Sequence, residues 1–151
     1  MKLNIWERLF ILNPLRPFVQ RHLEARWLHS LGGGLSGGRA LEGDCYQEGI
    51  GPYAPFAQIL RRAFEDGEEE AFGLPDFVLA DLLILSPALR LRYPDLPPNP
   101  PLDPKAEQLR LFENVVAFCA ALSERAPLLL VLEDAHWADP TTLELIEAWL
   151  D

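Results

Sequence analysis

The most informative stretch of the chain is PLLLVLEDAHW, residues 127–137. Its five consecutive apolar residues, Leu128 to Leu132, do not alternate with polar ones. This pattern is typical of a strand that is buried on both faces of a parallel sheet. Two carboxylates, Glu133 and Asp134, close the run. The stretch therefore predicts a central strand that ends in an acidic pair.

A helix is predicted directly after the acidic pair. Asp139 is a typical N-cap residue, Pro140 suits the first helical position, and apolar residues then repeat at helical spacing. Strand, turn and helix in this order form one half of a nucleotide-binding α/β layer. The carboxylates lie at the carboxyl end of the strand, which is the edge where open α/β sheets bind their ligands.

An acidic pair at this edge has a specific chemical use. A magnesium ion that bridges nucleotide phosphates keeps most of its waters, and a carboxylate on a rigid strand can hold those waters in place. A neighbouring carboxylate can orient the water that attacks the terminal phosphate. In this hypothesis Glu133 is the metal-site residue and Asp134 the catalytic residue. A strand that ends at a solvated turn also commonly ends in Asp or Glu, so the pair alone leaves a purely structural interpretation open.

Upstream of this strand, the chain is predicted to form short helices and connectors. Cys119 lies on the apolar face of the longest of these helices, with Leu109, Phe112, Val116 and Ala120, and is predicted to belong to the core. Six prolines crowd residues 94–104 and indicate an extended connector before that helix. The predicted helices cover residues 3–12, 18–31, 55–64, 75–91 with a break at Pro87, and 104–125 with Asp103 as N-cap, and a short strand covers residues 40–46.

A glycine-rich segment lies between the first helices and the rest of the chain. Residues 33–40 read GGLSGGRA, which has the spacing of the phosphate-binding loop G-x-x-x-x-G-K-[ST]. However, Arg39 stands where the lysine belongs and Ala40 stands where the hydroxyl belongs. The segment also follows a helical pattern, whereas a phosphate loop follows a buried strand. We interpret it as a linker.

Composition excludes several classes of function. The chain has 151 residues, which suits one compact domain, and 13 basic against 23 acidic side chains give a net charge of -10. This balance argues against a general affinity for nucleic acid or anionic lipid. Two cysteines are too few for a disulfide scaffold, and no apolar run approaches the roughly 18 residues of a spanning helix. We expect a cytoplasmic protein that binds neither membranes nor nucleic acid directly.

The sequence VLEDAHWADPTTLELI, residues 131–146, closely resembles the Walker B segment and following helix of an AAA-type ATPase domain. The resemblance is to the signal-transduction ATPases of the STAND class, bacterial regulators that often carry a LuxR-type DNA-binding domain, a nucleotide cyclase or a protein kinase. Residues 43–61 and 92–122 look like other parts of the same domain. The resemblance implies an α/β fold, a partial three-layer P-loop NTPase core, with ATP and Mg²⁺ as cofactors.

One family motif has no acceptable copy in the sequence. In this class a Walker A loop, with its lysine and hydroxyl, precedes the part that resembles residues 39–61. We therefore expect a fragment truncated at both ends, with a helical segment and glycine-rich linker over residues 1–38 and a partial ATPase domain over residues 39–151. Because the phosphate loop supplies the amides and the lysine that bind the triphosphate, ATP hydrolysis by this chain alone is not expected.

Two hypotheses for function follow from this pattern. The first is a fragment of an ATP-binding regulatory ATPase, in which Glu133 and Asp134 are the magnesium and water-activating residues. The alternative is a non-catalytic interaction module derived from the same fold, which binds a protein partner or associates with itself. DNA binding through the arginines of the first 26 residues ranks last, because no helix-turn-helix pattern accompanies them.

Overall fold

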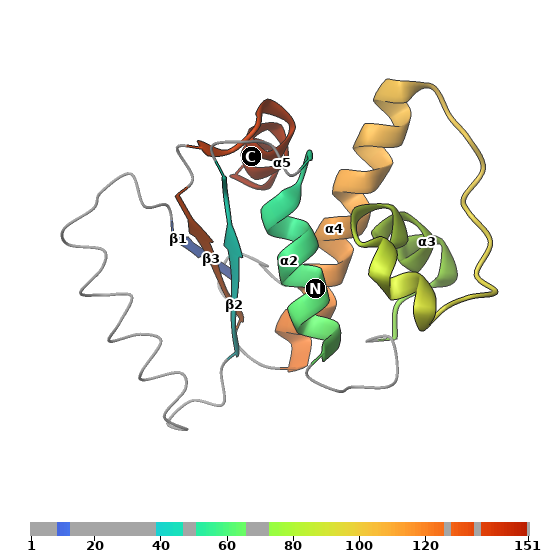
Figure 1. The fold of residues 1–151 in the computed structure, drawn as a ribbon, viewed down its shortest axis with the longest axis horizontal. Helices are drawn as coiled ribbons and strands as arrows, with labels where there is room; N and C mark the ends of the chain where they lie inside the picture. Colours follow the sequence, from blue (N-terminus) through green and yellow to red (C-terminus); the bar gives the residue numbers. More distant parts are fainter. Residues whose placement is uncertain are drawn as a thin grey trace.

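The computed structural model describes residues 9–12, 39–46, 51–65, 73–125, 128–134 and 137–150 (Figure 1). The predicted helix over residues 18–31, most of the glycine-rich segment and His136 lie outside these ranges. Within them, no helix is both long and apolar enough to span a bilayer.

The described strands form one parallel sheet. Its strands are β1 (Leu9–Leu12), β2 (Arg39–Asp44) and β3 (Leu128–Glu133), in the order β1-β3-β2. In the register of the sheet Asp44 is paired with Glu133, and the backbone N–H of Cys45 then donates to the carbonyl of Glu133 over 3.0 Å. The strand that ends in the acidic pair is therefore central, which confirms the prediction.

The prediction of a helix over residues 3–12 is wrong for its second half. Leu9–Leu12 is strand β1, and all four residues are in register with β3, beginning with the pair Leu9 and Leu128. Four consecutive apolar residues fit a single helical turn and a buried strand equally well. The pairing with β3, which lies more than a hundred residues away in the sequence, decides between them.

The helices in the described ranges lie close to the ranges predicted from the sequence. They are α2 (Ala54–Glu65), α3 (Asp76–Leu85), the short 3-10 helix η2 (Pro87–Leu91), α4 (Pro104–Arg125) and α5 (Pro140–Leu150). The break predicted at Pro87 separates α3 from η2. In Figure 1, α2 lies between the sheet and α3, and α4 runs beside both helices. This mixture of a parallel sheet with helices is an α/β fold and fits a partial P-loop NTPase core.

A single apolar core joins the sheet to the helices. Leu41 of β2 and Leu130 of β3 are register partners, and both are buried against the helices. Cys119 is buried in this core, as predicted, but Leu109 is 59% exposed, so the predicted face of α4 is only partly correct. The buried face instead includes Asn114, whose amide bonds to a buried carboxylate. The core also contains Phe56, Ile59, Leu60, Phe64, Leu82, Val115, Phe118 and Leu145.

The first turn of α2 packs unusually close to β2, and Gly43 makes this possible. A Cβ at this position would lie 2.3 Å from the carbonyl oxygen of Pro55. No real Cβ contact is that short, so any side chain here would force α2 away from the sheet. The glycine therefore sets how near the start of α2 comes to the acidic edge.

A buried carboxylate holds the proline-rich connector. Asp81 of α3 accepts hydrogen bonds from Asn99 (2.7 Å), Arg110 (3.0 Å) and Asn114 (2.7 Å). Arg110 also donates to the carbonyl of Pro100 over 2.8 Å. Since a buried charge is tolerated only when it is paired and hydrogen-bonded, this network fixes the connector against α3 and α4.

Candidate functional site

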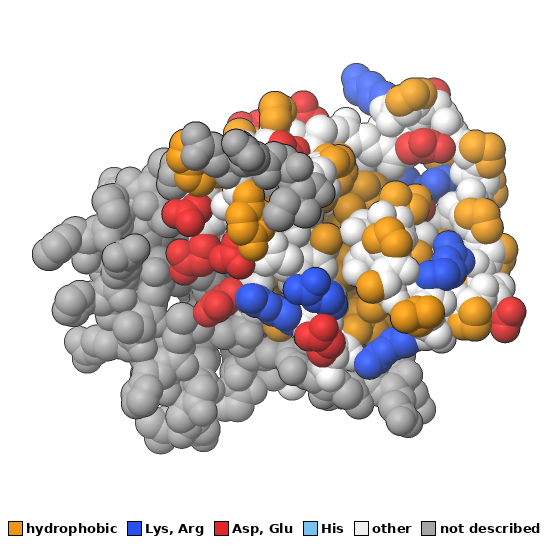
Figure 2. Space-filling view, viewed as in Figure 1, with side chains coloured by type: hydrophobic (Ala, Val, Ile, Leu, Met, Phe, Trp, Pro, Cys, Tyr) orange, Lys and Arg blue, Asp and Glu red, His pale blue; other side chains and the backbone are white. Residues whose placement is uncertain are grey.

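Carboxylates from two neighbouring strands meet at the carboxyl edge of the sheet. Asp44 and Glu133 close β2 and β3 at the same register level, and Asp134 follows directly. Glu133 is half-buried and Asp134 is exposed. Figure 2 shows acidic side chains gathered over the part of this face that overlies β2 and β3. The structure thus brings the two predicted site residues to the expected edge, and adds Asp44, which was not among the predicted site residues.

Asp134 forms the start of a tight turn. Its φ is +54°, in the left-handed region, and its carbonyl accepts a hydrogen bond from the N–H of Trp137 over 2.8 Å. Aspartate and asparagine enter this region more readily than other residues with a Cβ. The turn ends β3 sharply and leads the chain into α5.

Asp139 is the N-cap of α5, as predicted. Its side chain accepts hydrogen bonds from the backbone N–H groups of Thr141 and Thr142, both over 3.1 Å, and from both threonine hydroxyls. Pro140 occupies the first helical position. Because capping uses the whole Asp139 carboxylate, this residue is explained by structure and needs no role in metal binding.

The hydrogen bonds at Asp139 also set its pKa. Burial alone would raise the pKa, but the bonds from Thr141, Thr142 and the backbone of Tyr53 outweigh it and hold the pKa below the usual 3.8. A carboxylate with a lowered pKa in the folded state stabilises the fold above its unfolded pKa. That contribution is lost as the pH falls through the folded value.

We predict that Asp139→Ala lowers the free energy of unfolding by about 1–2 kcal/mol at pH 7, as expected for a lost N-cap. The difference from the parent chain should begin to narrow as the pH falls below the unfolded pKa of about 3.8, and should vanish once the pH passes the lower folded pKa of Asp139. Urea unfolding at pH 7 and at low pH measures both effects. The exposed Asp95, in the connector, provides the control variant Asp95→Ala. A difference that stays constant with pH would contradict the prediction.

The loop between β2 and α2 is tied to α5. Tyr53 has φ of +62°, and its N–H donates to the hydroxyl oxygen of Thr142 over 3.1 Å. Thr142 is fully buried and itself donates to Asp139. The carbonyl of Tyr53 accepts from Ala57 in the first turn of α2 (3.0 Å). Strained backbone persists only where its surroundings hold it, and Thr142 supplies such a contact.

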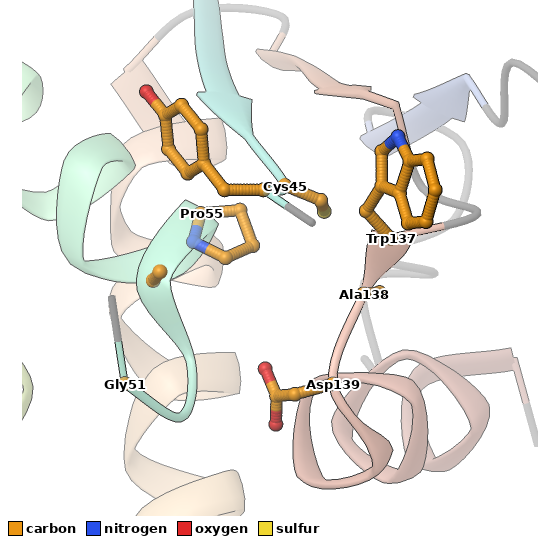
Figure 3. A pocket seen from close by; sticks show the side chains of 8 residues that line it. Cys45, Gly51, Pro55, Trp137, Ala138 and Asp139 are labelled. Atoms are coloured by element: carbon orange, nitrogen blue, oxygen red, sulfur yellow. The ribbon is translucent and has the colours of Figure 1, made fainter. Parts of the chain in front are cut away.

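A small cavity lies between this loop and the turn after β3 (Figure 3). Its volume is about 30 Å³, enough for one or two water molecules and far below the roughly 300 Å³ of the smallest common ligand pockets. Figure 3 shows Cys45 and Trp137 on opposite sides of it, with Asp139 below them. The cavity beside the acidic edge is therefore large enough for water but too small to be a nucleotide pocket.

The pKa of the Cys45 thiol is raised by burial and by the negative charge of this edge. Burial, followed by the charges of Asp139, Asp134 and Asp44, raises its pKa to about 11. The thiol stays protonated at neutral pH and is not a nucleophile. Cys119 is likewise buried, and burial raises its pKa well above the usual value.

The donor set at the edge fits a hydrated magnesium ion better than a fully protein-bound one. Among the residues that the structure describes, no three His, Cys, Asp or Glu side chains form a group that could hold a metal ion. Magnesium in nucleotide sites needs only one or two carboxylates, because phosphates and waters supply the other ligands. Glu133 and Asp44 at adjacent strand ends meet that smaller requirement.

Comparison with known proteins assigns the family. A family model described as an AAA ATPase domain matches residues 20–151, most of the chain. The chain belongs to the AAA ATPase domain family. No curated protein and no solved structure matches it. This AAA ATPase domain is thus of the P-loop ATPase class, whose members in general use ATP and Mg²⁺.

Membership of this family agrees with the observed geometry of the sheet edge. The family explains a parallel sheet with a helix after each of β2 and β3, and ligands of such sheets bind at the carboxyl ends of the strands. The individual roles of Glu133 in metal binding and of Asp134 in catalysis stay predictions.

Proposed function

We propose that the chain is part of a nucleotide-binding regulatory ATPase of the STAND class, acting in cytoplasmic signalling or transcription control in bacteria. The observation that carries the proposal is the acidic pair at the end of a central parallel strand, in a chain of the AAA ATPase family. The resemblance of residues 131–146 to a Walker B segment supports the finer class.

In this proposal each carboxylate has a separate task. Glu133 would hold waters of a bound magnesium ion, and that ion would neutralise charge on the nucleotide phosphates. Its half-buried position at the end of a rigid strand suits an outer-shell ligand. Asp134, exposed on the turn, would orient the water that attacks the terminal phosphate. Asp44 adds a second carboxylate at the same level of the sheet.

Turnover requires a group that this sequence does not provide. The motif G-x-x-x-x-G-K-[ST], whose amides and lysine hold the triphosphate, does not occur in the 151-residue sequence. We therefore propose that residues 39–151 supply the magnesium side of the site. The isolated chain should bind Mg²⁺-nucleotide weakly and should not hydrolyse it.

Titration with a fluorescent ATP analogue tests the proposal. The analogue should bind in the presence of Mg²⁺ and lose affinity when EDTA is added. Glu133→Gln should weaken binding by about 10-fold to 100-fold, the usual effect of removing an outer-shell metal partner. Asp134→Asn should bind like the parent chain, because the proposed role of Asp134 is in catalysis and not in binding.

Glu113→Gln provides the matched control. Glu113 is exposed on α4, away from the sheet edge, so its substitution should leave binding unchanged. Binding that is insensitive to both EDTA and Glu133→Gln would refute the assignment of the edge. No binding even at millimolar nucleotide would refute it as well, and would favour the non-catalytic interaction module.

A further inference from the structure

A second hollow, much larger than the small cavity, lies next to it and shares Tyr46 and Ala54 with it. It is an open groove of about 490 Å³ between the end of β2, α2 and the junction of α3 with η2. This volume is in the range of small-molecule sites, roughly 300–1,000 Å³. Its lining includes one acidic residue, Asp44, and an apolar wall around Leu85 and Pro87. The other polar and charged residues that line it are Tyr46, Gln58, Arg61, Arg62 and Ser86.

One wall of the groove is fixed by Gln58. Its side chain accepts from the N–H of Asp44 over 3.1 Å and donates to the carbonyl of Asp44 over 3.3 Å. The amide therefore bonds to the end of β2 as a neighbouring strand would. Because Gly43 also lets the first turn of α2 approach β2, this side of the groove is preformed.

The groove places two arginines side by side in an acidic chain. Arg61 and Arg62 have side chains that are 55% and 39% exposed, and Figure 2 shows basic side chains together over α2. Their ion pairs are long, 3.6 Å from Arg61 to Glu65 and 3.7 Å from Arg62 to Glu42. Arg62 also donates to the carbonyl of Glu42 over 2.6 Å. Since exposed ion pairs contribute little, a bound anion can compete with Glu65 for Arg61.

Ser86 gives independent evidence for a ligand. It is only 6% exposed and lines the groove, yet its side chain makes no cap hydrogen bond. Buried polar side chains are normally hydrogen-bonded. The other buried polar residues among those described, Asp81, Asn114, Ser123 and Thr142, each have a side-chain hydrogen bond. The hydroxyl of Ser86 thus has no hydrogen-bond partner among the described residues, and a ligand in the groove would supply one.

We propose that this groove binds a small organic anion, a carboxylate or a phosphate ester with an apolar body. Arg61 pairs with the anionic group, and Arg62 adds positive charge beside it. The hydroxyl of Ser86 makes a hydrogen bond to the ligand, and Leu85, Pro87 and the ring of Tyr46 contact its apolar part. This site adjoins the proposed nucleotide edge at Asp44, which lines the groove, but it does not require Glu133 to function.

Amide chemical shifts of the intact chain in NMR titrations test the site. The probes are phenyl phosphate and benzoate, with benzyl alcohol as the neutral control. One or both anions should give saturable shifts at residues of the groove, with dissociation constants up to about 1 mM. The tighter of the two identifies the anionic group. Binding should weaken as salt is added, because the arginines are exposed.

Variants decide whether the groove is responsible. Arg61→Gln should weaken binding about tenfold, since it removes a charge-assisted contact, whereas the exposed Arg92 gives the control Arg92→Gln with unchanged affinity. Ser86→Ala should weaken binding about threefold or more without lowering the melting temperature, because no partner inside the protein is lost. Glu133→Gln should bind like the parent chain.

The proposal is overturned by any of four results. These are the absence of saturable shifts, equal affinity for benzyl alcohol, full affinity in Arg61→Gln, or shifts confined to the acidic edge and lost in Glu133→Gln. A lower melting temperature in Ser86→Ala would also count against it, because the hydroxyl would then have a structural partner.

Discussion

Arg110→Ala should lower the free energy of unfolding by about 3–5 kcal/mol, the usual cost of leaving a buried charge without its partner. Asp81 is almost fully buried, and Arg110 is the only cation among the three described residues that donate to it. Removing the guanidinium leaves the carboxylate desolvated between α3 and α4. The substitution also breaks the bond to Pro100, so the connector should loosen.

Urea unfolding of Arg110→Ala measures this loss. Arg92→Ala is the control, because Arg92 is exposed and its substitution should change stability by less than about 0.5 kcal/mol. Hydrogen exchange should also become faster in residues 94–102. A loss below about 1 kcal/mol would show that the Asp81 network contributes much less than a buried ion pair normally does.

The second large effect is expected from Gly43→Ala. The added methyl group would lie 2.3 Å from the carbonyl oxygen of Pro55, which is backbone and cannot rotate away. The start of α2 must then move from β2, so we expect a loss of about 2–3 kcal/mol, the upper part of the range for overpacked sites. The displaced helix should also alter the groove and the cavity, because Pro55 and Gln58 line them.

Gly73→Ala separates this clash from the general cost of replacing glycine. Gly73 has φ of +69°, but a Cβ there would have no neighbour within 4 Å. Its substitution should therefore cost only the backbone strain of about 1–2 kcal/mol. Thermal or urea unfolding measures the loss of stability in both variants. If Gly43→Ala loses no more stability than Gly73→Ala, and its amide shifts around residue 43 are unchanged, then the close approach of α2 is not rigid.

Local signals explain which parts of the fold could be predicted from sequence. The apolar run before Glu133 has only one sensible interpretation when a helix start signal follows it. Asp139 with Pro140, and Asp103 with Pro104, mark helix starts through contacts within four residues, and both caps form as predicted. Strand β1 was missed because its four residues carry no such signal, and only pairing with β3 defines it.

The candidate site, like the fold, could be predicted from sequence only where local signals define it. Glu133 and Asp134 could be placed at the sheet edge from sequence, because Glu133 is the last residue of the predicted strand and Asp134 follows it directly. Asp44 could have been added, since the sequence predicts a strand over residues 40–46 and parallel strands end at one edge. The network of Asp81 and the isolated hydroxyl of Ser86 depend on contacts between distant elements, and no sequence spacing encodes them.

The bridge made by Thr142 has a mechanical consequence. One hydroxyl joins the N-cap of α5 to the backbone of Tyr53, which in turn begins α2. If a rearrangement of the acidic edge tilts α5, the start of α2 must tilt with it or this hydroxyl must release Tyr53. A shift of α5 at the end of β3 is therefore expected to be felt at the start of α2 through this single buried hydroxyl.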